Sequence, residues 1–142
     1  MRVLNEKIIS FLILLLIFCV GCNNNDESIG LSGTYNYSGY NADDVLIISG
    51  TLDLNVSDST HVTGTWQLNQ VNDENNVGPQ TGTGNLEGGF NNDVLMLDLN
   101  PGWADNNVFL IGKFEAGNFN GAWEYSGFAG AINQGYFTTE KK

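Results

Sequence analysis

Few side chains in this sequence could carry out catalysis. Nucleophilic catalysis by Ser or Cys needs a positioned base, and the single histidine of the chain is His61. The alternation of polar and apolar residues around His61 points its side chain outward, so we interpret it as a solvated surface residue. Paired carboxylates stand at Asp43-Asp44 and Asp73-Glu74, but their spacing does not specify a glycosidase. We therefore expect a protein that is not an enzyme.

Metal-binding patterns are equally weak. The sequence has no Cys/His cluster with the spacing of a transition-metal site. Oxygen-rich segments at 41–44, 72–76 and 98–105 could hold Ca²⁺, although none follows the EF-hand spacing. Asn and Asp are also frequent in loops because their side chains complete turns. We expect no cofactor and no metal, with calcium in these loops as the alternative.

Charge and composition exclude several classes of protein. The chain has 142 residues, 16 of them acidic and 5 basic, and a net charge of −11 at pH 7. A protein that binds nucleic acid needs a face of Lys and Arg to release counterions, so we expect no nucleic-acid partner. The 42% hydrophobic content is too high for a disordered chain, and 18 Gly with 2 Pro are typical of strands and tight turns.

The N-terminus has the pattern of a secretory signal peptide. Arg2 and Lys7 accompany an apolar run at 8–20 that is too short to span a bilayer. The run ends in Gly21-Cys22, which resembles the bacterial lipobox, although Cys19 stands where that motif usually has Leu. The resemblance implies that residues 1–21 are removed and that Cys22 receives a lipid; a plain signal peptide is the alternative.

This segment predicts where the protein is located. We expect a lipidated polar tether at 22–30, followed by one folded domain at 31–142. Multiple acyl chains would anchor the protein stably to a membrane. By resemblance to the sorting rules of Gram-negative cells, Asn23 favours the outer membrane, with the domain facing either the periplasm or the outside. Removal of 1–21 leaves three lysines and 15 acidic residues, a net charge of −12.

A short module recurs along the rest of the chain: an apolar residue, any residue, Gly, any residue, an apolar residue. The Gly and its apolar neighbours lie two residues apart, which places them on one face of a strand, with polar residues on the other. Gly weakens the middle of a strand, and its repetition favours a sheet that bends sharply, as in a small barrel. The copies are 31–35, 48–52, 62–66, 110–114 and 119–123, with a looser copy at 82–86.

The pattern predicts eight strands and no helix after the signal peptide. Longer connections alternate with short ones, so an up-and-down meander would place the longer loops at one end and the tight turns at the other. The fold class we expect is therefore all-β, an eight-stranded antiparallel up-and-down β-barrel. The predicted strands are 31–38, 45–56, 61–69, 80–90, 93–99, 107–115, 118–126 and 131–138.

This pattern resembles the avidin and lipocalin superfamily of meander barrels. In local sequence the resemblance covers 33–35 and 62–66, with Tyr35 where both families favour Trp. The resemblance implies a small-ligand site at the loop-bearing end, and no set of biotin-contacting residues can be matched.

Aromatic residues favour the same end of the predicted barrel. We predict an apolar pocket whose walls are Tyr37, Trp66, Trp123 and Tyr125, with Tyr40, Trp103 and Phe128 as rim contacts. A barrel of eight strands can instead fill its interior with these side chains.

Three functions remain open at this point. We predict a non-catalytic barrel that binds a small apolar or aromatic ligand at its mouth. The alternative is a module that binds a basic protein, such as an inhibitor of lysozyme or of a protease in the cell envelope, because the negative charge would steer such a partner. A purely structural role is the third.

Overall fold

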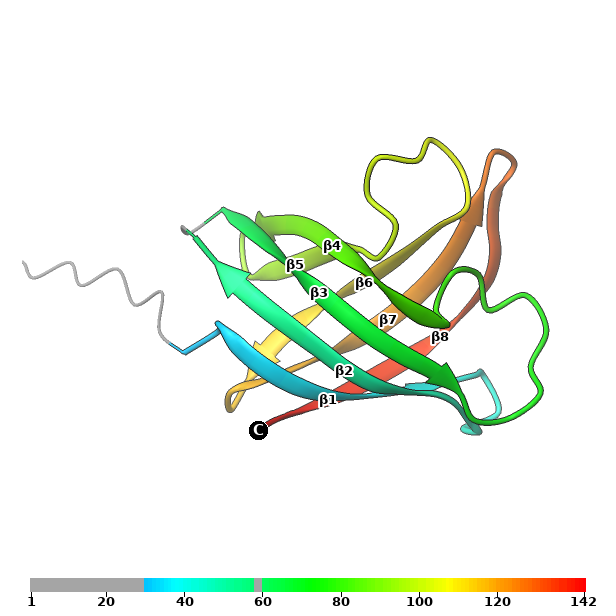
Figure 1. The fold of residues 1–142 in the computed structure, drawn as a ribbon, viewed down its shortest axis with the longest axis horizontal. Helices are drawn as coiled ribbons and strands as arrows, with labels where there is room; N and C mark the ends of the chain where they lie inside the picture. The colour runs from blue at the N-terminus through cyan, green and yellow to red at the C-terminus, as the bar shows by residue number, and fades with distance from the viewer. Residues whose placement is uncertain (1–29, 58–59) are drawn as a thin grey trace, which may run out of the picture.

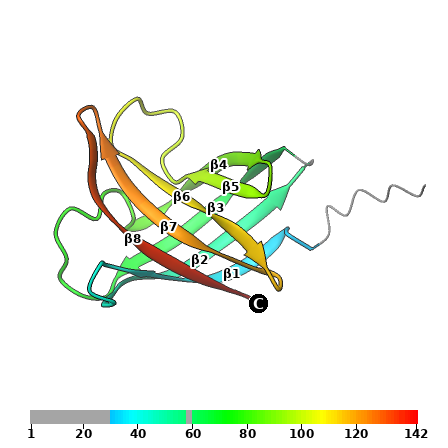
Figure 2. The same cartoon turned by 180° about the vertical axis from the view of Figure 1, so that it is seen from behind.

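The computed structural model describes residues 30–57 and 60–142, so the predicted signal peptide and lipid site at Cys22 lie outside the described residues. Each strand pairs antiparallel with the next, and β8 pairs with β1 to close a barrel (Figures 1 and 2). The predicted eight-stranded up-and-down barrel is confirmed. The strands are β1 (Gly33–Tyr40), β2 (Leu46–Val56), β3 (His61–Gln70), β4 (Gly82–Asn91), β5 (Val94–Asp98), β6 (Asn107–Glu115), β7 (Asn118–Gly127) and β8 (Gly130–Lys141).

The barrel core follows from the period-two pattern of the strands. In β1, Tyr35 and Tyr37 are buried, whereas the Asn36 between them is exposed. The same alternation on the other strands gives one interior cluster of aliphatic and aromatic side chains. The apolar members of the recurring module point inward because they alternate with polar residues that face water.

Close contact between strands explains two of the module glycines. Gly112 of β6 and Gly121 of β7 are paired. A Cβ on Gly121 would lie 2.5 Å from the Gly112 Cα and 2.1 Å from the carbonyl oxygen of Ile111. A side chain at this position would push the two strands apart, so Gly lets the backbones approach where the sheet coils.

The two ends of the barrel differ as predicted. The connections 41–45, 71–81 and 99–106 lie at one end together with the β7–β8 turn, and we call this the loop end. The β2–β3 connection and the turns at 92–93 and 116–117 lie at the opposite end, the tight-turn end, where β8 also ends (Figure 1). The β7–β8 connection is shorter than expected, because pairing continues to Gly127 and Gly130 and leaves only Phe128 and Ala129 unpaired.

Within the described residues, no helix has the length and apolar character needed to cross a bilayer.

Candidate functional site

The structure places the four predicted pocket-wall residues in the barrel interior. Tyr37 and Trp123 are fully buried, Trp66 is 6% exposed, and Tyr125 is partly buried against the same core. They lie on β1, β3 and β7, on the inward-facing positions of those strands.

The polar atoms of these buried aromatic residues have partners inside the protein. The indole N–H of Trp123 donates to the main-chain oxygen of Tyr40 at 2.8 Å. The indole N–H of Trp66 donates to the main-chain oxygen of Leu99 at 2.8 Å and to that of Asn85 at 3.1 Å. Buried donors need such partners, so in this conformation the two indole N–H groups stabilise the fold.

The long β3–β4 connection folds into the mouth of the barrel. Its Val77 and Gln80 are buried. The Tyr37 hydroxyl donates to Gln80 Oε1 at 3.3 Å, and Gln80 Nε2 donates to the main-chain oxygen of Val77 at 2.7 Å. Gly78 lies against the Tyr125 ring, with its φ at +69°. The loop therefore packs on Tyr37 and Tyr125, two of the four residues predicted as pocket walls.

Burial under this loop changes the acidity of Tyr37. Loss of solvation raises the pKa of its hydroxyl far above the usual value near 10. The hydroxyl is thus a neutral donor to Gln80 at any physiological pH.

The role of this loop was not predicted from the sequence. Gln80 was expected at the start of a strand, and Val77 had no predicted role. The signal that could have indicated it is Val77 itself, an apolar residue that directly follows five polar residues at 72–76, because an isolated apolar residue in a polar segment is often buried.

The three predicted rim residues occupy different positions. Trp103 is 70% exposed and Phe128 is 83% exposed, both at the loop end. Tyr40 stacks on Tyr136 of β8, with ring centroids 4.8 Å apart and an interplanar angle of 7°. Because Tyr136 alternates with the inward-facing Phe137, this stacked pair lies on the outer wall of the barrel.

Trp103 and Phe128 project from neighbouring connections. The Tyr125 hydroxyl donates to Asn106 Oδ1 at 2.9 Å, which fastens the β5–β6 loop to β7. Gly127, the last residue of β7, lies close to the Asp105 carboxylate in the same loop. The loop end therefore presents two exposed aromatic side chains on segments that are held together.

Charge is distributed unevenly between the two ends. The connections of the loop end carry five carboxylates, and all three lysines of the described chain lie toward the tight-turn end, on β6 or at the end of β8. The carboxylates are those of Asp43, Asp44, Asp73, Glu74 and Asp105, and the lysines are Lys113, Lys141 and Lys142.

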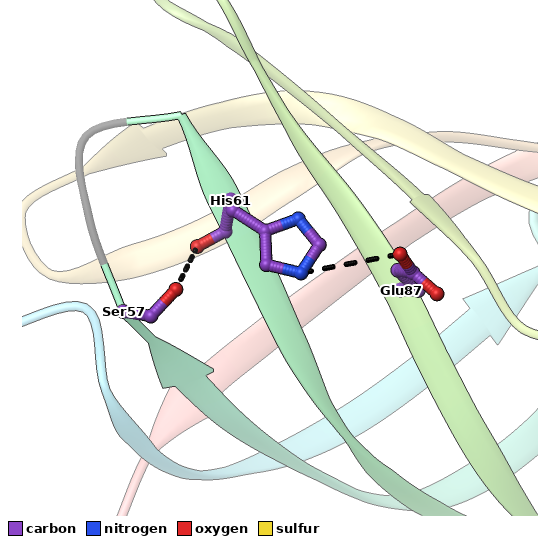
Figure 3. A network of polar contacts seen from close by, with 3 residues as sticks. All are labelled: Ser57, His61 and Glu87. Atoms are coloured by element: carbon purple, nitrogen blue, oxygen red, sulfur yellow. Dashed lines mark hydrogen bonds and ion pairs between the residues drawn. The ribbon is translucent and has the colours of Figure 1, made fainter.

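His61 lies on the outer wall of the barrel, as the alternation predicts (Figure 3). Its imidazole Nε2 is 3.9 Å from Glu87 Oε1, with both side chains about half exposed. The Ser57 hydroxyl contacts the main-chain oxygen of His61 at 3.4 Å, not the imidazole. This geometry supports an outer-wall contact rather than a base aligned with a nucleophile.

The oxygen-rich loops use their side chains in turns. Asn41 Oδ1 accepts the main-chain N–H groups of Asp43 and Val45, each at 3.0 Å. The Asp98 carboxylate accepts the N–H of Asn100 at 2.8 Å and the amide of Asn107 at 2.7 Å. Across residues 30–57 and 60–142, no three His, Cys, Asp or Glu side chains converge as a metal site would require.

No protein-family model matches the sequence, and no curated protein is similar to it. The barrel topology is the one that a resemblance to avidins and lipocalins implies, and the resemblance itself stays a prediction.

Proposed function

We propose that the protein is a non-catalytic binding protein of the cell envelope, a lipid-anchored barrel that holds its target at the loop end. The observation that carries this proposal is the exposure of Trp103 and Phe128, at 70% and 83%. Large aromatic side chains that stay in water are typical of interaction sites, because their apolar area contributes to affinity once a partner covers it.

The path of the chain supports an anchor on the opposite side. Lys141 Nζ donates to the main-chain oxygens of Gly30 and Ser32, and the Tyr35 hydroxyl donates to that of Leu31 at 2.7 Å. The described chain therefore begins at the tight-turn end. With a lipid on Cys22, the eight residues 22–29 would span at most about 28 Å. The tight-turn end would face the membrane, which we propose is the outer membrane, and the loop end would face away from it.

Charge favours a basic protein as the target. The five carboxylates on the connections of the loop end create a negative field at that end. Such a field speeds the approach of a positively charged partner and weakens with salt. A basic envelope enzyme, for example a lysozyme or a protease, fits this surface.

A small apolar or aromatic ligand is the second candidate. The connection at 71–81 contacts two of the four predicted pocket-wall residues, Tyr37 through its hydrogen bond with Gln80 and Tyr125 through Gly78. A ligand could reach Trp123 and Tyr37 after residues 71–81 move. It would have to replace the buried contacts of Val77 and Gln80.

Native mass spectrometry of the protein purified from its own cells tests the proposal. We expect a retained basic protein whose mass is lost from Trp103→Ala/Phe128→Ala. The matched control is Met96→Ala, which removes a half-exposed apolar side chain from the outer wall. Hen-type lysozyme is the first purified probe, and its association should weaken steeply with salt. A retained small molecule that survives the double substitution would contradict the loop-end proposal and favour the interior site.

A further inference from the structure

The barrel wall has a split between β4 and the β5–β6 loop. Strand β5 is short, and its pairing with β4 ends at Glu87 and Asp98. Residues Gly82 to Leu86 continue toward the loop end and pair with β3 alone. Half of β4 therefore has a neighbouring strand on one side only.

The backbone groups that face this split follow from the hydrogen bonds. The N–H of Phe90 donates to the Thr60 oxygen on the β3 side. Along a strand, the N–H and C=O groups of one residue point to one neighbouring strand and those of the next residue point to the other. The N–H and C=O groups of Thr83, Asn85 and Glu87 therefore point away from β3, toward the β5 side. The Asn85 oxygen accepts the Trp66 indole, which reaches across to the Leu99 oxygen as well.

Trp66 closes the inner side of the split, because it packs over Gly84, where a Cβ would lie 2.6 Å from its ring. The outer side is open. Gly82, Thr83 and Asn85 are exposed, so the N–H and C=O of Thr83 and the N–H of Asn85 point to the place where a continued β5 would lie.

A groove of about 530 Å³ lies beside this edge. Its walls include Thr63 and Thr65 of β3, Asn85 and Glu87 of β4, and Pro101 and Gly102 at the tip of the β5–β6 loop. The groove therefore lies on the outer face of the barrel at residues 85–87, next to the open edge, and extends across β3 to Asn55 of β2.

We propose that this split is a docking site for an extended segment of a basic protein, which adds to β4 as a further strand. Main-chain hydrogen bonds along an open edge supply affinity, and alternate side chains of the added segment enter the groove. The Glu87 carboxylate and the negative charge of the chain favour Lys and Arg in that segment. Trp103 directly follows the wall residues Pro101 and Gly102 but is not itself a wall residue, and neither is Phe128. The inference rests on the backbone of β4 and not on these two side chains.

Two other occupants are disfavoured. A second copy of the chain could pair edge to edge, but each copy carries a net charge of −11, or −12 without residues 1–21, and like charges oppose that contact. A neutral sugar could bond the Asn and Thr side chains of the groove, but it would leave the strand edge unused.

The test is a selection of random heptapeptides on the purified protein, followed by affinity measurement on variants. Thr83→Pro removes the N–H that faces the split, and a proline on an open edge leaves the pairing with β3 intact. Thr83→Ala is the matched control, because it keeps the N–H and removes the exposed side chain. We expect selected peptides rich in Lys or Arg that bind Thr83→Ala as they bind the wild type and bind Thr83→Pro about tenfold more weakly.

Two readouts do not depend on the folding of the proline variant. Only every second N–H of an added strand faces β4. Of the two sets of peptides N-methylated at every second residue, the set that lacks these N–H groups should therefore lose binding, and the other set should keep it. In hydrogen exchange, bound peptide should protect the amides of Thr83 and Asn85, while the amide of Gly84, which faces β3, should change little.

Several results would overturn the inference. These are a selection without enriched peptides, affinities insensitive to both Thr83→Pro and N-methylation, and protection confined to other parts of the barrel. Self-association that Thr83→Pro abolishes would assign the edge to a second copy, and binding of neutral oligosaccharides unaffected by Thr83→Pro would assign the groove to sugars. Trp103→Ala/Phe128→Ala keeps the N–H groups of Thr83 and Asn85, so the selected peptides should bind this variant as they bind the wild type, which separates failure of this inference from failure of the loop-end proposal.

Discussion

Truncation of Trp123 tests whether the aromatic layer is a packed core. Its side chain is fully buried, and its N–H donates to the Tyr40 oxygen at 2.8 Å. Trp123→Ala removes that contact area and leaves a cavity, which destabilises a protein by about 3–5 kcal/mol. A domain of this size has a free energy of unfolding of about 5–15 kcal/mol. With a urea m-value of about 1.5 kcal/mol per molar, the unfolding midpoint should fall by about 2–3 M.

Urea unfolding followed by circular dichroism gives the measurement. Trp103→Ala is the matched control: it makes the same truncation at a side chain that is 70% exposed and should change the free energy of unfolding by less than about 0.5 kcal/mol. Trp123→Phe keeps a buried aromatic ring, removes the indole N–H and part of the ring volume, and should cost about 1–3 kcal/mol because the Tyr40 oxygen loses this donor. A Trp123→Ala variant within about 1 kcal/mol of the wild type would refute the packed interior and favour an open pocket.

Three further predictions concern the loop, the alkaline limit and the anchor. Gly78→Ala should lower the thermal unfolding temperature, because an alanine at φ +69° is strained and its Cβ would lie 2.5 Å from the Tyr125 ring; an unchanged melting curve would show that the loop does not press on that ring. Burial raises the pKa of Tyr37, so its contribution to stability is complete below about pH 10 and is lost at higher pH as the unfolded chain ionises; Tyr37→Phe should flatten this alkaline decline in urea titrations, and an equal slope would contradict it. Cys22→Ser should leave the protein unacylated and in the soluble fraction after cell fractionation, and a variant that still sediments with membranes would exclude the lipid anchor.

The fold could be predicted because its determinants are local. The Gly-centred module and the alternating side chains place each strand, as the agreement over 107–115 shows. The inward direction of Trp66 and Trp123 follows from the same alternation. The positions of the turns also follow, since Ala116 and Gly117 both adopt positive φ in the tight β6–β7 turn.

The site was less predictable because it depends on contacts between distant segments. The burial of Gln80 is set by Tyr37, which lies 43 residues earlier in the chain. Tyr40 is next to a register shift in β1 and stacks on β8, so alternation alone did not place it. The split beside β4 arises from the early end of β5 at Asp98, a difference of a few residues that pattern analysis does not resolve.

Site-specific photo-crosslinking in the native cells is the decisive experiment for binding at the loop end. A photoreactive phenylalanine analogue would replace Trp103 or Phe128 at the loop end, with the exposed Ile111 and Lys113 of β6 as comparison sites. We expect positions 103 and 128 to capture one and the same basic protein, whose yield falls as salt rises, and positions 111 and 113 not to capture it. Capture of that protein mainly from position 111 or 113 would contradict binding at the loop end.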